Sequence, residues 1–184
     1  MPMTDIGATL NTPIDWRTPA EANSVFDLSN SGGEGSVTLN DEQLKNDLKI
    51  PDEMIKQQHE SEKLPEGVSL LLYKKGIIGE TSTITEIQLT HKKVEGGTTA
   101  KAAADEFAQR YSSGVKVAPV QLPVGEAQKV TITTKSRDGE TGHHIDYVMV
   151  NNEDVYILSF QTEQSAEIIE DIAQPVAESF RLTK

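Results

Sequence analysis

The architecture of this chain is most evident in residues 127–162, AQKVTITTKSRDGETGHHIDYVMVNNEDVYILSFQT. Three segments with the length and pattern of strands lie at about 127–135, 143–151 and 155–162. The sequences Arg-Asp-Gly-Glu at 137–140 and Asn-Asn-Glu-Asp at 151–154 join them, and both are typical of tight turns between antiparallel strands. The stretch therefore predicts an antiparallel meander.

Amphipathic helices are predicted on both sides of this meander in the sequence. The first begins at a capping Thr98 or Thr99 and runs to Ser113, with Gly114 as its stop signal. Its apolar stripe has spacings of three and four and consists of Ala100, Ala103, Ala104, Phe107, Ala108 and Tyr111. The second helix runs from Ser165 to Phe180, and Pro175 should kink or tighten it. Its buried stripe consists of Ala166, Ile169, Ala173, Val176 and Phe180.

Two earlier strands complete the predicted sheet, at 68–73 and 83–94, and the imperfect alternation of the second indicates a bulge. Between the first helix and the meander, Pro119, Pro123 and Gly125 indicate a connector. The expected fold class is α+β, with an antiparallel β-sheet flanked by helices.

The length of 184 residues fits one domain with an N-terminal extension. Residues 1–39 are polar and rich in turn formers, so we expect an extended segment that the sole tryptophan, Trp16, docks onto the body. Residues 40–184 form the single domain. Within it, residues from about 40 to 63 are interpreted as a helical insertion that Pro51 divides.

The charge of the chain limits its partners. Asp and Glu number 29 against 17 Lys and Arg, and the net charge of −12 repels phosphate backbones, so we expect no nucleic-acid partner. The sequence contains no run of about 18 apolar residues, so we expect no transmembrane helix. The absence of Cys excludes disulfides, thiolate catalysis and cysteine-ligated metals. The opening Met-Pro-Met-Thr-Asp suits a chain from which a signal peptide or a lipid-anchored cysteine has been removed.

The C-terminal half follows an ordered pattern: a Lys-Ser-Arg-Asp-Gly-Glu turn, Tyr147-Val-Met-Val150, an Asn-Asn turn, Val155-Tyr-Ile-Leu-Ser-Phe160 and Ala177-Glu-Ser-Phe-Arg-Leu182. From about Pro65 to Leu182 this order resembles the PsbP-like superfamily, and Pro13-Ile-Asp-Trp16 is similar to its early Pro-x-x-Trp motif. Its members include the photosystem II subunit PsbP, a Ran-binding import factor and bacterial envelope lipoproteins. The resemblance implies an α/β/α sandwich used for binding and assembly, and it supplies no catalytic residues.

Potential metal ligands gather around the first turn of the meander, namely Asp138, Glu140, His143, His144 and Asp146. Because side chains alternate along a strand, His144 and Asp146 share one face while His143 points to the other. A tetrahedral zinc site needs three or four ligands, so His91 or His59 would have to contribute. The other interpretation is that these are polar residues at a solvated strand end.

Motifs for other chemistry are missing from the sequence, which lacks Gly-x-Ser-x-Gly and any glycine-rich loop followed by Lys-Ser/Thr. We therefore expect a non-enzymatic binding or assembly module with no cofactor, exported to the bacterial cell envelope or secreted, and acting on an unidentified protein partner. The alternatives are a small metal-dependent hydrolase or metal-binding protein using His143, His144 and Asp146 with a divalent metal, and a cytoplasmic regulatory protein.

Overall fold

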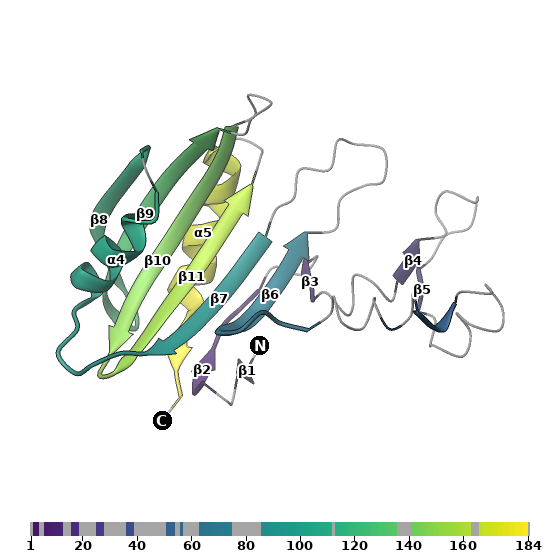
Figure 1. Ribbon diagram of the computed structural model, residues 1–184, viewed down its shortest axis with the longest axis horizontal. Coiled ribbons are helices and arrows are strands. Elements are labelled where there is room, and N and C mark those ends of the chain that lie inside the picture. The colour runs from purple at the N-terminus through teal and green to yellow at the C-terminus, as the bar shows by residue number, and fades with distance from the viewer. Residues whose placement is uncertain are drawn as a thin grey trace.

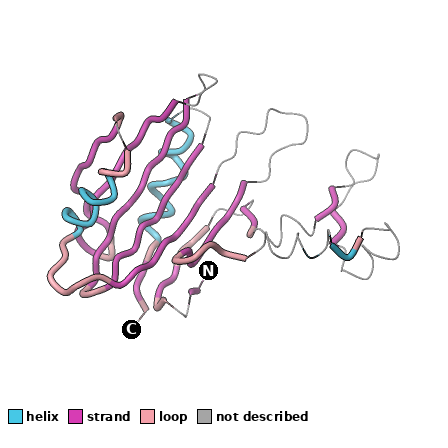
Figure 2. Tube along the Cα trace, viewed as in Figure 1, coloured by secondary structure: helices cyan, strands magenta, loops and turns pink. Residues whose placement is uncertain are grey.

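The computed structural model describes residues 2–3, 6–12, 16–18, 25–27, 36–38, 51–53, 56, 63–74, 86–111, 113–135, 141–162 and 166–183. Its main element is a seven-stranded antiparallel sheet in the order β3-β6-β7-β11-β10-β9-β8 (Figure 1). The strands are β3 (Trp16–Arg17), β6 (Val68–Lys74), β7 (Glu86–Lys93), β8 (Val115–Leu122), β9 (Gly125–Lys135), β10 (Thr141–Asn151) and β11 (Asp154–Thr162). Helix α4 (Ala100–Ala108) lies on one face and α5 (Ala166–Ser179) on the other (Figure 2). The predicted fold class, α+β with helices flanking an antiparallel sheet, is confirmed.

Two smaller sheets involve the N-terminal residues. Strands β1 (Pro2–Met3), β2 (Ala8–Thr9) and β12 (Arg181–Leu182) form one, and β4 (Val25–Asp27) pairs with β5 (Ser36–Thr38) in the other. The backbone N–H of Thr183 donates to the carbonyl of Gly7 at 2.7 Å, which ties the two ends of the chain together. Most of the predicted helical segment at 40–63 lies outside the described residues. Within this segment, the described residues 52, 53 and 56 are helical. None of the described helices has the length and apolar character that crossing a membrane requires.

The meander forms as its alternation and turns predict. Strand β10 pairs with β9 on one side and with β11 on the other, and both pairs are antiparallel. At the second turn Asn152 has a φ of 56°, the left-handed conformation that Asn tolerates better than most residues. The first turn, at 137–140, lies outside the described residues. The register shift expected in the strand at 83–94 is found on its partner β6 instead, between Val68 and Leu70.

Two sequence-based predictions are wrong: the end of the first helix and the connector before the meander. The first helix ends at Ala108, five residues before the predicted Ser113, although Tyr111 still packs on the core beneath α4. The predicted connector around Pro119 is strand β8, which pairs with β9 at the edge of the sheet. An edge strand tolerates proline because one of its two sides needs no ladder hydrogen bond.

At the centre of the sheet both faces are buried, and β10 shows this most clearly. Its residues Ile145 to Met149 are all buried, so the strand reads as a continuous apolar run interrupted only by Asp146. Alternation directs Tyr147 to the core under α5, with Leu158, Phe160 and Phe180, and Val148 to the core under α4. Asp146 must therefore lie on the α4 face.

Candidate functional site

A pocket lies beside α4, on the face of the sheet that this helix covers only in part. Helix α4 packs on β8, β9 and β10, and neither α4 nor α5 covers the neighbouring part of this face, over β11 and β7 (Figure 1). The cavity there has a volume of about 240 Å³, and β7, β10, β11 and the C-terminal end of α4 line it. This combination gives the pocket a floor of sheet side chains and one wall of helix side chains.

The pairing register makes the floor of the pocket polar. Two rows of paired residues cross β7, β11 and β10, and all six line the cavity: Glu86, Gln161 and His144 in one row, and Gln88, Ser159 and Asp146 in the next. Residues paired directly across strands lie on the same face, at about 5 Å spacing. The floor is thus a compact group of carboxyl, amide, hydroxyl and imidazole side chains.

Asp146 is the most unusual member of this group, because its side chain is charged at high pH and only 2% of it is exposed. Burial raises the pKa of this carboxyl from 3.8 to about 7, and a hydrogen bond with Ser159 lowers it in part. The second oxygen, Oδ2, is buried and has no hydrogen-bond partner among the described residues. Native proteins rarely leave such an atom unsatisfied, and Asp146 is one of the residues that line the pocket.

The other titratable groups of the floor also respond to burial. Burial raises the pKa of Glu86, and the Gln161 amide, which donates to its Oε2 at 3.3 Å, lowers it in part. For His144, burial and then the nearby His143 lower the pKa, which keeps the imidazole neutral at pH 7. The floor therefore holds acidic groups beside a neutral imidazole.

Aromatic side chains from α4 and the turn after it form the wall. The ring centroids of Phe107 and Tyr111 lie 5.8 Å apart, and Tyr111 contacts the His144 ring at 6.4 Å. The guanidinium of Arg110 lies 5.6 Å from the Phe107 ring centroid, a cation–π distance. The pocket thus combines an aromatic wall with a floor made mostly of polar side chains.

The structure brings together only part of the predicted metal cluster. His144 and Asp146 line the pocket, whereas His143 is paired with Thr162 and Thr133 and points to the opposite face. Asp138, Glu140 and His59 lie outside the described residues. Within the described part of the chain, no three His, Asp or Glu side chains are grouped so as to hold a metal ion.

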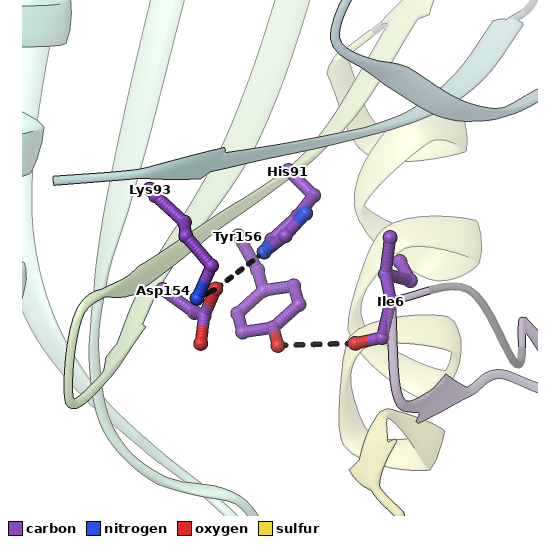
Figure 3. A network of polar contacts seen from close by, with 5 residues as sticks. All are labelled: Ile6, His91, Lys93, Asp154 and Tyr156. Carbon is purple, nitrogen blue, oxygen red and sulfur yellow. Dashed lines mark hydrogen bonds and ion pairs between the residues drawn. The ribbon is translucent and has the colours of Figure 1, made fainter.

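His91, the other histidine considered as a ligand, belongs to a separate network on the α5 face (Figure 3). Its Nε2 lies 2.7 Å from Asp154 Oδ1, and its ring stacks on Tyr156 with centroids 4.9 Å apart. The hydrogen bond with His91, with a further contribution from Lys93, holds the pKa of Asp154 below its usual range. The Tyr156 hydroxyl donates to the carbonyl of Ile6 at 3.2 Å, so this network anchors the N-terminal segment.

Sequence reasoning missed the pocket residues outside β10. In β7 and β11, polar residues alternate with largely apolar ones, and Glu86, Gln88 and Ser159 are among the polar residues. This alternation could have predicted a polar face on both strands. Nothing in that pattern showed that these residues would meet Asp146 or the aromatic wall.

No family model and no curated protein matches the chain. Among solved structures, it is similar to a protein of Bacteroides thetaiotaomicron VPI-5482, with a TM-score of 0.52 and 12% identity over 97% of this chain and 46% of that one. It is also similar to LpqN of Mycobacterium tuberculosis, described as involved in cell envelope biogenesis, with a TM-score of 0.50 and 12% identity over 96% of this chain and 83% of LpqN. The chain thus spans less than half the length of the first protein. At this identity both likenesses show the fold alone, and the narrower PsbP-like assignment stays a prediction.

Proposed function

We propose that this protein is a non-enzymatic binding module of the bacterial cell envelope that holds a small ligand in the pocket beside α4. The observation that supports this proposal is the buried carboxyl of Asp146, a residue that lines the cavity and whose Oδ2 has no hydrogen-bond partner among the described residues. A ligand that donates a hydrogen bond there would satisfy an atom whose isolation otherwise costs about 1–3 kcal/mol. The floor residues lie on paired strands, which hold their positions more firmly than loops would.

The location in the envelope rests on likeness of fold. LpqN, which shares the fold at a TM-score of 0.50, is described as involved in cell envelope biogenesis. The sequence resemblance to the PsbP-like superfamily, with its bacterial envelope members, agrees with this location. Fractionation of cells that express the full-length gene tests it, and recovery of the protein in the cytoplasmic fraction alone would contradict it.

Binding in the pocket is tested by NMR with isotopically labelled protein and a library of small polar and aromatic compounds. We expect some of them to shift the amide signals of Gln88, Tyr111 and Ser159 and to be recovered unchanged. Replacing Thr90, which lines the cavity, with Tyr fills it and should abolish these shifts. The matched control is Thr133→Tyr, at an exposed threonine on β9, which should leave them intact. The proposal fails if no compound shifts the pocket amides, or if compounds are turned over.

The alternative, a metal-dependent hydrolase or metal-binding protein, has a narrower basis. It draws on His144 and Asp146, which share the pocket, but His143 would need to reach around the strand. Elemental analysis of the purified protein for Zn, Mn and Ca tests it directly. A stoichiometric metal lost on Asp146→Asn would favour this alternative over an organic ligand.

A further inference from the structure

The charges around the pocket narrow the class of ligand. Glu86 and Asp146 both line it, and burial disfavours the charge on each carboxyl, so a cation between them would stabilise both ionised forms. The two cationic side chains of the lining have other contacts. The ammonium of Lys92 lies 3.4 Å from Glu106, and Arg110 lies over the Phe107 ring.

Among the described residues, the remaining titratable groups of the lining add no positive charge to the floor. His144 from β10 is held neutral at pH 7, and Tyr111 at the end of α4 has a raised pKa because burial and the nearby Asp146 disfavour its ionisation. From β11 the pocket receives only Ile157, Ser159 and Gln161. Within the described part of the lining, the charge at the floor that lacks a close counterpart is therefore negative.

The wall and the size of the pocket indicate the rest of the ligand. Phe107 and Tyr111 present aromatic surface, which attracts flat apolar groups and, through its negative faces, cations. A volume of about 240 Å³ lies below the 300–1,000 Å³ typical of pockets for drug-sized ligands. The ligand must therefore be small.

Resting on the function proposed above, we infer that the ligand is a small aromatic amine, with its ammonium group donating to the Asp146 carboxylate and its ring packed against Phe107 and Tyr111. Glu86 provides a second negative charge on the same floor. The amine is thus held by a charge-assisted hydrogen bond at one end and by aromatic contact at the other.

Three probes that share one ring and differ in their head group test this inference: benzylamine, benzyl alcohol and benzoate. Their dissociation constants are measured by NMR titration of the full chain near pH 7.5. Benzyl alcohol can also donate a hydrogen bond to the Asp146 carboxylate but carries no charge, so benzylamine should bind roughly 10-fold more tightly than benzyl alcohol. Benzoate should bind most weakly.

Two variants assign the contacts. Asp146→Asn should reduce benzylamine affinity to the level of benzyl alcohol, while Asp154→Asn, which removes an aspartate outside the pocket, should leave the preference for the amine unchanged. Phe107→Leu keeps an apolar wall without the aromatic face and should weaken benzylamine by a factor of about 3 to 10 more than benzyl alcohol. Circular dichroism verifies that each variant is folded.

The inference is overturned if benzyl alcohol or benzoate binds as tightly as benzylamine, if none of the three binds, or if Asp146→Asn retains the preference for the amine. These results would leave the proposed function standing wherever other compounds still shift the pocket amides and the Thr90→Tyr variant abolishes those shifts. Loss of all pocket binding in the wider library would instead end both.

Discussion

Replacement of Asp146 by Asn should stabilise the protein increasingly as the pH rises. The carboxyl is buried in the middle of β10, and its pKa in the folded protein is about 7 against an ordinary value of 3.8. That difference of roughly three units, at about 1.36 kcal/mol each, corresponds to about 4 kcal/mol of native-state destabilisation once the group is ionised. The isosteric amide of the variant never ionises and avoids this cost.

The sign follows from proton binding. Below about pH 4 the carboxyl is protonated in both states and costs nothing. Between about pH 4 and 7 the folded protein keeps a proton that the unfolded chain has released, so the free energy of unfolding falls by about 1.4 kcal/mol per pH unit. Above about pH 7 the penalty is constant. The amide's own hydrogen bonding adds an offset of about 1 kcal/mol that does not change with pH.

Urea unfolding followed by circular dichroism, at several values between about pH 4.5 and 7.5, measures the difference between the variant and the unmodified protein. Taking the difference cancels the titration of groups that both proteins share. Asp154→Asn is the matched control, because the hydrogen bond with His91 lowers the pKa of Asp154 and the sign is reversed. There the unmodified protein should be the more stable by an amount that stays constant over this range, because the advantage is lost only below about pH 4, as the pH falls towards the lowered pKa. A difference for Asp146→Asn that stays constant with pH would refute the reasoning.

Further substitutions test the packing around the sheet, each by urea unfolding. Phe180→Ala removes a fully buried ring from the core under α5 and should cost about 3–5 kcal/mol. Tyr156→Phe removes the hydrogen bond to the Ile6 carbonyl, should cost about 0.5–1.5 kcal/mol, and should speed proteolysis of the N-terminal segment. Gly114 has a φ of +74° and a β-carbon there would meet a β9 carbonyl oxygen at 2.4 Å, so Gly114→Ala should cost more than Gly97→Ala, where φ is +90° and the space is open. Equal costs for the two glycines would contradict the steric argument.

Much of the fold follows from short-range patterns. The meander and the two helices were predicted because alternation, helical spacing and turn residues act over a few positions. Strand β8 was missed because Pro119 reads as a break, and only the order of the sheet shows that β8 lies at its edge, where proline is tolerated. The early end of α4 was missed because Tyr111 continues the apolar stripe after the helix has ended.

The candidate site, too, could be predicted only in part from the sequence. Period-two alternation alone places His144 and Asp146 on one face of β10 and His143 on the other. The residues that complete the pocket come from β7, β11 and the end of α4, and only the pairing register brings Gln88 opposite Ser159 and Ser159 opposite Asp146. The raised pKa of Asp146 likewise depends on burial, and the elements around this carboxyl come together only in the folded protein.

Local sequence thus specifies which segments become strands and helices and which way each side chain points, because backbone conformation depends mainly on near neighbours. Packing of distant segments specifies which side chains meet, how deeply they are buried and how they titrate. Desolvation depends on every atom that surrounds a group, and for Asp146 those atoms come from strands and a helix far apart in the chain. For that reason Asp146, which in the sequence was one of several possible metal ligands, became the centre of the candidate site only in the folded protein.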